Sequence, residues 1–286
     1  MKVLRHARGT TPLDRCLVMG IVNRTPDSFY DPGRMRLDEV VSFGLGLVDD
    51  GADLLDVGGV KAGPGEEVSE DEEARRVVPL VAALAACTEV PISVDTGRAS
   101  VARRALEAGA AIVNDVTGLA DPELAPVVAE SGAAFVVVHH GGQIRARPRH
   151  PRFDDVVADV LATWARLVEL ATKAGVRRES IVVDAALDFG KTTFHSLELV
   201  HRLPEQLAAG FPIMVAASRK DLVGETLGAA PADRLEGSLA VAAVAAYLGA
   251  HIVRVHDVRE SVRTVRMAEA IAARRPPAAA LRGLWE

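Results

Sequence analysis

The chain has 286 residues, of which 49% are apolar and 25% are charged, which is ordinary for a globular protein with a large core. Its formal charge of −6 argues against a nucleic-acid-binding surface, which would normally be basic. Cys16 and Cys87 show no metal-ligand spacing, the first residues lack an apolar signal-peptide core, and no run approaches the ~20 apolar residues of a membrane span. We therefore expect a cytoplasmic protein without nucleic-acid or membrane partners.

Short apolar segments rich in Val and Ile recur along the chain, and each contains or precedes a polar residue near its downstream end. They cover 17–23, 53–59, 92–96, 112–116, 135–140, 181–185, 213–218 and 252–257. Strands of this kind alternating with helices predict an α/β protein, a single-domain (β/α)8 TIM barrel, whose active site lies at the C-terminal rim of the strands. Polar residues in these segments include Asp56, which we assign no role. We expect an N-terminal extension over 1–15, the barrel over 16–273 and a Pro/Ala-rich tail over 274–286.

Helices are expected between these strands. Their ranges are 38–50, about 70–87, 98–108, 122–131, 153–174, 194–209, 233–248 and 258–273. Ser69 followed by Glu72 resembles a capping box at the start of the second helix. The stretch 233–249 is rich in Ala and nearly apolar on several faces, so it is buried either in the outer layer of the barrel or against a second subunit. The second option predicts a homodimer through this helix.

A series of short motifs then resembles, in order, those of the dihydropteroate synthases. The motifs are GIVNRTPDSFYDPG from residue 20, DVGG from residue 56 with Pro64 and Gly65, SVDT (93–96), NDV (114–116), FGK (189–191), SRK (218–220), RLEGSLA (234–240) and RVHDV (254–258). The resemblance covers residues 16–273, and a collinear series is far more specific than one motif. It implies a pterin-binding barrel of a transferase that condenses 6-hydroxymethyl-7,8-dihydropterin diphosphate with p-aminobenzoate and releases pyrophosphate.

The resemblance also implies the residues of the pterin and diphosphate sites. Asp95, Asn114 and Asp184 match positions that hold the pterin ring, and Lys220 matches the lysine beside it. Each could instead cap a helix N-terminus, but four residues in register favour the ligand. Asn23 matches the asparagine that contacts Mg²⁺, the expected cofactor, and Arg254 and His256 match the residues that bind the diphosphate. The implied catalytic residues are Asn23, Lys220, Arg254 and His256.

The aminobenzoate half of the site departs from the family. Its positions here are Arg24, Val60, Lys61, Ala62, Gly63, Asp188, Phe189 and Ser218. The family's Gly-Gly-Glu-Ser-Thr-Arg-Pro-Gly has lost its Glu, Ser, Thr and Arg over residues 58–65. In the loop after 181–185, the family's Asp-Pro-Gly-Phe-Gly-Phe-Gly-Lys has become a sequence in which Asp188 adds a carboxylate beside the incoming anionic aminobenzoate. His140 stands where the family commonly has Met over the pterin.

Two explanations compete for these changes. In the first, Arg24 and Lys61 restore the lost positive charge, and the protein is a fully active synthase with relocated contacts. In the second, which we favour, the pterin and diphosphate sites persist while condensation with p-aminobenzoate is weak, altered towards another arylamine, or lost. A non-catalytic pterin-binding paralogue is an alternative of a different class. A methyltetrahydrofolate methyltransferase is less favoured because Arg254 and His256 match a diphosphate site and no corrinoid-binding domain is present.

Overall fold

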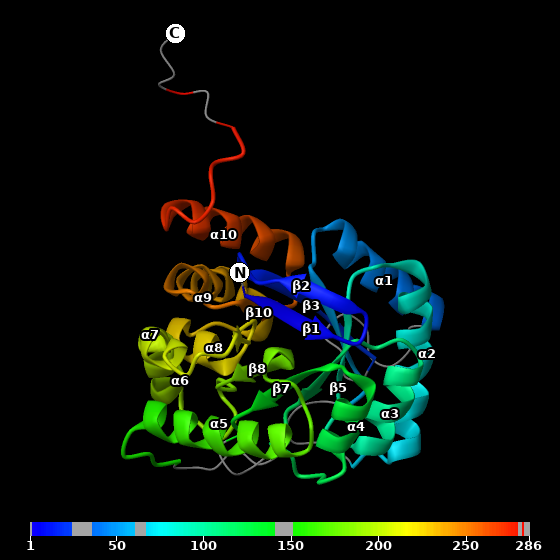
Figure 1. Ribbon diagram of the computed structural model, residues 1–286. Coiled ribbons are helices and arrows are strands. Elements are labelled where there is room, and N and C mark those ends of the chain that lie inside the picture. Colours follow the sequence, from blue (N-terminus) through cyan, green and yellow to red (C-terminus); the bar gives the residue numbers. More distant parts are fainter. Residues whose placement is uncertain (1, 25–35, 61–66, 141–150, 280–281, 283–286) are drawn as a thin grey trace.

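Eight parallel strands close into a barrel, as the sequence predicts, in the order β10-β3-β4-β5-β6-β7-β8-β9. The computed structural model describes residues 2–24, 36–60, 67–140, 151–279 and 282. The strands of the barrel are β3 (Leu17–Asn23), β4 (Leu54–Gly58), β5 (Ile92–Asp95), β6 (Ile112–Asp115), β7 (Ala134–Val138), β8 (Ile181–Asp184), β9 (Ile213–Val215) and β10 (Ile252–Val255). Helices lie outside the strands (Figure 1). The predicted (β/α)8 barrel is confirmed.

The helices follow the predicted ranges closely, except that one expected helix is divided in two and one helix is additional. They are α1 (Leu37–Asp49), α2 (Glu70–Cys87), α3 (Ala99–Glu107), α4 (Leu124–Ser131), α5 (Val156–Lys173), α6 (Thr193–His201), α7 (Leu203–Leu207), α8 (Asp221–Leu227), α9 (Leu235–Leu248) and α10 (Val258–Ile271). Short 3₁₀ turns cover Arg178–Ser180 and Pro231–Asp233. Ser69 caps α2 by accepting the Glu72 N–H at 3.3 Å. The additional helix, α8, was not predicted from the sequence and spans only seven residues.

The single helix expected over 194–209 was wrong, because the chain breaks at Arg202 into α6 and α7. Pro204 has no N–H and its ring would clash with the carbonyl four residues earlier, so a continuous helix is disfavoured. The break frees the carbonyl of Leu199, and the side-chain amide of Gln206 donates to it at 2.6 Å. This buried amide therefore supplies the hydrogen bond that the interrupted helix cannot make.

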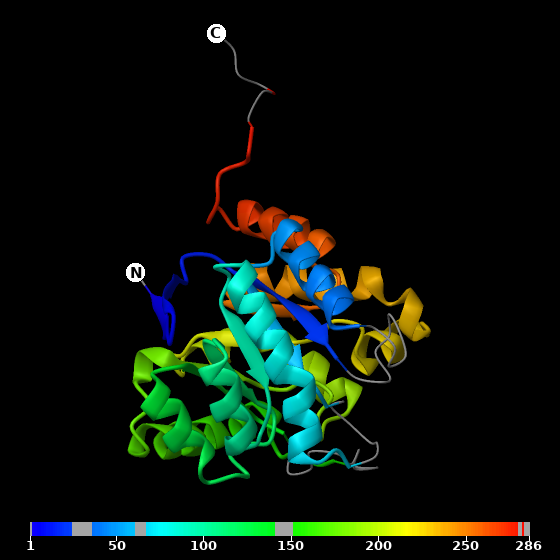
Figure 2. The same ribbon diagram turned by 90° about the vertical axis from the view of Figure 1, so that its right-hand side faces the viewer.

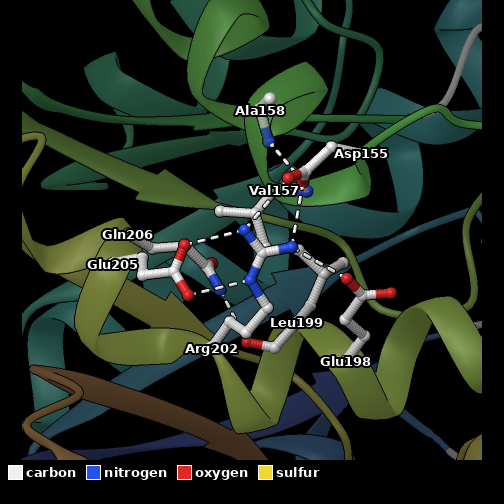
Figure 3. Close-up of polar contacts among 8 residues, drawn as sticks. All are labelled: Asp155, Val157, Ala158, Glu198, Leu199, Arg202, Glu205 and Gln206. Carbon is white, nitrogen blue, oxygen red and sulfur yellow. Dashed lines mark hydrogen bonds and ion pairs between the residues drawn. The ribbon is translucent and has the colours of Figure 1, made fainter.

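Arg202 reinforces the break with a network of ion pairs (Figure 3). Its guanidinium contacts Asp155 at 3.0 Å, Glu198 at 2.8 Å and Glu205 at 2.7 Å. Asp155 is also the N-cap of α5 and accepts the N–H groups of Val157 and Ala158. The network joins α5, α6 and α7, although partly exposed ion pairs of this kind contribute little each to stability.

The interior of the barrel is apolar towards the N-terminal ends of the strands. Side chains alternate along each strand, so every second residue points inward. The inward residues include Leu17, Met19, Leu54, Ile112, Val136, Val182, Met214 and Ile252, which form one buried cluster with Leu4 and Leu13. Their outward neighbours belong to a larger cluster beneath the helices.

An antiparallel hairpin covers this apolar end of the barrel. It consists of β1 (Val3–His6) and β2 (Gly9–Pro12), and it stands apart from the ring of helices in Figure 2. Leu4 is fully buried among the inward residues, and the Ala7 N–H donates to the carbonyl of Ala111 just before β6. The residues expected to form a simple extension therefore complete the core. In the described part of the chain, no helix is long and apolar enough to cross a membrane.

Candidate functional site

The inward positions at the C-terminal ends of the strands carry polar side chains. Side chains alternate between the two faces of a strand, so the residue two positions after an inward apolar residue also points inward. These inward polar residues are Asp56 on β4, Asp95 on β5, Asn114 on β6, Asp184 on β8 and Arg254 on β10. All except Arg254 and Asp95 are buried, and those two are nearly so. Five of the eight strands thus supply polar groups to one enclosed region.

Arg254 connects three of these strands. Its Nε donates to Asp56 Oδ2 at 2.6 Å, and its Nη2 donates to Asp95 Oδ2 at 3.0 Å. Asn114 donates from Nδ2 to the same oxygen of Asp56 at 3.2 Å. Asp56, which is fully buried, is the centre of this network, and sequence analysis gave it no role. The signal was present, since a carboxylate within the apolar segment LLDVG needs a buried partner.

Two oxygen atoms of this network have no hydrogen-bond partner among the described residues. Asp56 Oδ1 and Asn114 Oδ1 are both buried without a hydrogen-bond partner in the described structure. A buried acceptor without a partner costs free energy unless a ligand or water supplies a donor. The two acceptors therefore match a ligand that presents N–H groups.

Protonation of the carboxylates is shifted by burial. Burial and the neighbouring Asp56 charge raise the pKa of Asp95 to about 7, against the opposing effect of Arg254. Burial also raises the pKa of Asp184, and the Lys220 charge partly offsets this. Asp184 Oδ1 accepts the Ala186 N–H at 2.7 Å. Near neutral pH, Asp95 can therefore either accept or donate a hydrogen bond to a ligand.

Lys220 reaches from the N-cap of α8 to the loop that follows β8. Its Nζ donates to the carbonyl of Leu187 at 2.8 Å and lies 4.7 Å from the centroid of the Phe189 ring. Burial lowers the pKa of Lys220, while Asp184 and Asp188 act in the opposite direction. The preceding Arg219 has a left-handed backbone (φ 55°) and pairs with both oxygens of Asp257 at 2.9 and 2.7 Å.

His256 and Ser218 form a second part of the site. Ser218 Oγ lies 3.1 Å from His256 Nδ1 and accepts the His256 N–H at 3.2 Å. Burial and the Arg254 charge lower the pKa of His256 to about 4. The ring is therefore neutral at physiological pH and acts as a hydrogen-bonding group, while Arg254 carries the positive charge.

Asn23 and Arg24 follow each other at the end of β3 but face different surroundings. Asn23 is exposed, and a Cβ on Gly58 would lie 2.8 Å from its Oδ1, so this close approach requires glycine. The Arg24 guanidinium instead donates to the carbonyls of Arg76 at 3.0 Å and Arg75 at 3.4 Å on α2. Pro79 has no N–H to offer the Arg75 carbonyl, so that oxygen is available to Arg24.

The remaining predicted aminobenzoate positions are only partly described. Lys61, Ala62 and Gly63 lie outside the described residues, and Val60 is half-buried at the end of the β4 segment. Asp188 is held by two donors, the Ser196 hydroxyl at 3.0 Å and the Leu222 N–H at 3.0 Å. Both oxygens of its carboxylate thus have partners within the protein. Its expected effect on an incoming aminobenzoate stays a prediction.

Asn23 presents an exposed amide group at the end of β3. Within the described ranges, no group of three or more His, Cys, Asp or Glu side chains could hold a metal ion. Mg²⁺ commonly uses one or two protein oxygens together with substrate phosphates and water. The exposed amide oxygen of Asn23 therefore fits such a shared site, and the residues present do not form a closed protein cage.

Comparisons with known proteins agree with this geometry. The family model described as "Pterin binding enzyme" matches residues 19–256. The chain is 47% identical over 278 residues to "Inactive dihydropteroate synthase 2" of Mycobacterium leprae, covering 95% of this chain and 96% of that protein. It is 40% identical over 267 residues to "Dihydropteroate synthase" of Escherichia coli, covering 92% of this chain and 95% of that protein.

Among solved structures, the Yersinia pestis dihydropteroate synthase in complex with a sulfonamide drug has a TM-score of 0.91 and 37% identity. That match covers 96% of this chain and 100% of the other. The Xanthomonas albilineans dihydropteroate synthase with 4-aminobenzoic acid has a TM-score of 0.88 and 38% identity, covering 95% and 99% of the two chains.

Proposed function

The chain belongs to the dihydropteroate synthase family of pterin-binding proteins, and from this premise we propose that it binds 6-hydroxymethyl-7,8-dihydropterin diphosphate with Mg²⁺. The observation that carries the proposal is the buried network of Asp56, Asp95, Asn114 and Arg254. A pterin presents a guanidine-like edge of N–H donors, and the two unpartnered acceptors, Asp56 Oδ1 and Asn114 Oδ1, suit such an edge. Asp184 and Lys220 complete the set of donors and acceptors.

The diphosphate would bind next to this pocket, at Arg254, His256 and Asn23. Arg254 supplies a cation whose position is fixed by two carboxylates, and His256 supplies a neutral hydrogen-bond donor oriented by Ser218. Mg²⁺, held by Asn23 and the substrate oxygens, would neutralise part of the diphosphate charge. Arg254 and His256 would stabilise the negative charge that develops on the leaving oxygen as the C–O bond breaks.

The bond changes of the family reaction are a substitution at the exocyclic methylene carbon of the pterin. The amine nitrogen of the second substrate forms a C–N bond to this carbon, the C–O bond to the diphosphate breaks, and the amine releases a proton. In this chain, Lys220 would lie beside the ring and Arg254 would hold the departing diphosphate. The proposal thus assigns this chain's own residues to the pterin half of the reaction.

The second-substrate half is different, and we propose that condensation with p-aminobenzoate is weak, altered or lost. Arg24, one of the two residues that could restore the lost positive charge, donates to α2 carbonyls. The Thr and Arg of the family loop are replaced by Ala62 and Gly63. Losing one hydrogen bond to a charged group costs about 1.5–3 kcal/mol, or roughly one to two decades of rate if it acts on the transition state. The 47% identity to a relative named as inactive supports this direction.

Two alternatives keep the same pterin site. A non-catalytic paralogue would bind the pterin diphosphate without turnover. A fully active synthase would use relocated contacts from Arg24 and Lys61, although the Arg24 guanidinium is directed towards α2. A methyltetrahydrofolate methyltransferase is disfavoured, because such a substrate would not need the diphosphate contacts proposed for Arg254 and His256.

We also propose that the protein forms a homodimer through α9. Only Ser238, Ala242, Ala245 and Ala246 of this helix are buried in the single chain. On its outer side Val244 is 45% exposed and Tyr247 is 51% exposed. Further exposed apolar side chains lie on neighbouring helices: Phe194 and Leu197 on α6, Leu227 on α8, and Met267 and Ile271 on α10. A second copy packed on α9 would cover Val244 and Tyr247.

A coupled assay for pyrophosphate release tests the proposed function. The purified protein is given the pterin diphosphate, Mg²⁺ and p-aminobenzoate, beside the double variant Ala62→Thr with Gly63→Arg, which restores two family side chains. We expect little release by the wild type and a gain of at least about tenfold in the variant. Release by the wild type at the rate of an ordinary synthase would favour relocated contacts. The non-catalytic alternative predicts tight pterin binding and no release by either protein.

A further inference from the structure

Asp188 occupies a position whose backbone conformation favours glycine. Its φ is 71°, in the left-handed region, and Ala186 two residues earlier has φ 49°. Non-glycine residues adopt this conformation at a cost, which is smaller for Asp because its short side chain can bond locally. The Asp188 side chain therefore must contribute contacts that offset this cost.

The contacts of Asp188 connect the loop after β8 to two helices. Its Oδ1 accepts the Ser196 hydroxyl at 3.0 Å, and its own N–H donates to Ser196 Oγ at 3.0 Å. Its Oδ2 accepts the N–H of Leu222 at 3.0 Å. Ser196 is fully buried on α6, while Asp188 is partly exposed. Leu222 is the second residue of α8.

Asp188 thereby caps α8 from another part of the chain. The N-cap of α8 is Lys220, whose side chain makes no capping hydrogen bond. The first N–H groups of a helix lack partners within the helix, and a carboxylate there is favoured by both hydrogen bonding and the helix dipole. Asp188 supplies the partner that Lys220 cannot supply, because the Lys220 ammonium is a donor and has no acceptor for a helix N–H group.

The backbone and the ammonium of Lys220 both lie close to the contact between Asp188 and Leu222. Its backbone begins α8, two residues before Leu222, while its Nζ donates to the carbonyl of Leu187 and lies over the Phe189 ring. Leu187 and Phe189 are the direct neighbours of Asp188. The hydrogen bond between Asp188 and Leu222 thus closes a ring that runs through Lys220 and back along the loop.

We infer that Asp188 is a positioning residue that fixes the Lys220 ammonium at the pterin site by joining the β8–α6 loop to the first turn of α8. The expected effect of Asp188 on pterin binding rests on the proposed function. Its effect on the position of Lys220 does not depend on any ligand. Asp188 therefore acts on the pterin half of the site rather than as a charge facing the second substrate.

Nuclear magnetic resonance of labelled lysine tests this inference without a ligand. The chain has five lysines, at positions 2, 61, 173, 191 and 220, so the Cε signals are few, and Lys220→Arg assigns the relevant one. In the wild type we expect the Lys220 signal to be shifted by the Phe189 ring. Asp188→Ala should move it to the position of an exposed lysine and should speed hydrogen exchange of the Leu222 amide. Asp188→Asn, which keeps an acceptor for one donor, should retain most of the shift.

Asp121→Ala is a matched control. Asp121 Oδ2 accepts the Ala99 N–H at 2.8 Å, so it also caps a helix, α3, from a neighbouring loop. This variant should lose comparable stability and leave the Lys220 signal unchanged. An unchanged Lys220 signal in Asp188→Ala, or an equal change in Asp121→Ala, would overturn the inference.

Binding of the pterin diphosphate with Mg²⁺ is measured on the same proteins. Asp188→Ala should bind about fivefold more weakly than the wild type, while Asp188→Asn and Asp121→Ala should stay within about twofold. If the Lys220 signal moves but the affinity does not, the functional consequence is refuted. If the wild type does not bind the pterin at all, the proposed function fails, and the signal of Lys220 still decides whether Asp188 positions it.

Discussion

Replacing Arg254 with Met removes the guanidinium that contacts both Asp56 and Asp95 while keeping much of the side-chain volume. Breaking a buried ion pair by removing one partner costs about 3–5 kcal/mol, because it leaves an uncompensated charge in the interior. Asp56 is fully buried and the Asp95 side chain is 14% exposed, so water screens this charge poorly. We expect the free energy of unfolding at pH 7 to fall by about this amount.

The stability difference between Arg254→Met and the wild type should also grow as the pH rises. Asp95 has a pKa of about 7 in the wild type, and Arg254 lowers it, so the variant carboxyl holds its proton to higher pH. Above pH 7 the folded variant keeps a proton that its unfolded chain has released, and its stability falls by about 1.36 kcal/mol per pH unit. The wild type has released this proton and stays nearly level, so the difference should widen by about 2 kcal/mol between pH 7 and pH 9.

Urea denaturation of both proteins at pH 7 and pH 9, followed by circular dichroism, measures this difference. Arg259→Met, on the outer helix α10, controls for the loss of a positive charge elsewhere and should change stability little. A loss below about 1 kcal/mol at pH 7, or a difference that is the same at both pH values, would refute the role given to the buried network.

Three other predictions follow from the fold and the site. Leu4→Ala should lower the free energy of unfolding in urea by about 3 kcal/mol, and a loss below about 1 kcal/mol would mean that the hairpin adds little to the core. His256 has a pKa of about 4 in the fold against an ordinary 6.5, so the unfolded chain binds the extra proton and wild-type stability falls as pH decreases from 6.5 to 4. His256→Asn should reduce that slope by up to about 1.4 kcal/mol per pH unit, and an identical slope would contradict the neutral ring. Val244→Glu combined with Tyr247→Glu should sediment as a monomer, whereas an unchanged dimer would move the interface away from α9.

The barrel could be predicted from the sequence because its signals are local. Each strand is a short run of Val, Ile and Leu, and the polar residue at its end lies within the same few positions. The break at Pro204 also had a local signal, but the helical periodicity on both sides of Arg202 obscured it. The α8 helix was missed because seven residues are too few to show a periodic apolar face.

The position of most predicted site residues near the strand ends could be read from the sequence, but the contacts between them could not. Asp95, Asn114, Asp184, Arg254 and His256 lie at the ends of strands β5, β6, β8 and β10 or directly after them, and Lys220 is the N-cap of α8, five residues after β9 ends. The role of Asp56 depends on its hydrogen bond with Arg254, which is 198 positions away in the chain and lies near it only in the folded barrel. Asp188 likewise depends on Leu222, 34 positions later. Such long-range hydrogen bonds leave no periodic pattern in the sequence.

Calorimetric titration of the purified chain with 6-hydroxymethyl-7,8-dihydropterin diphosphate and Mg²⁺ tests the central claim most directly. We expect saturable binding of one pterin per chain, weakened at least about tenfold in Asn114→Ala, which removes an unpartnered acceptor and a hydrogen bond to Asp56. Asp121→Ala should bind as the wild type does. The absence of binding by the wild type, or equal binding by Asn114→Ala, would contradict the assignment of this rim as a pterin site.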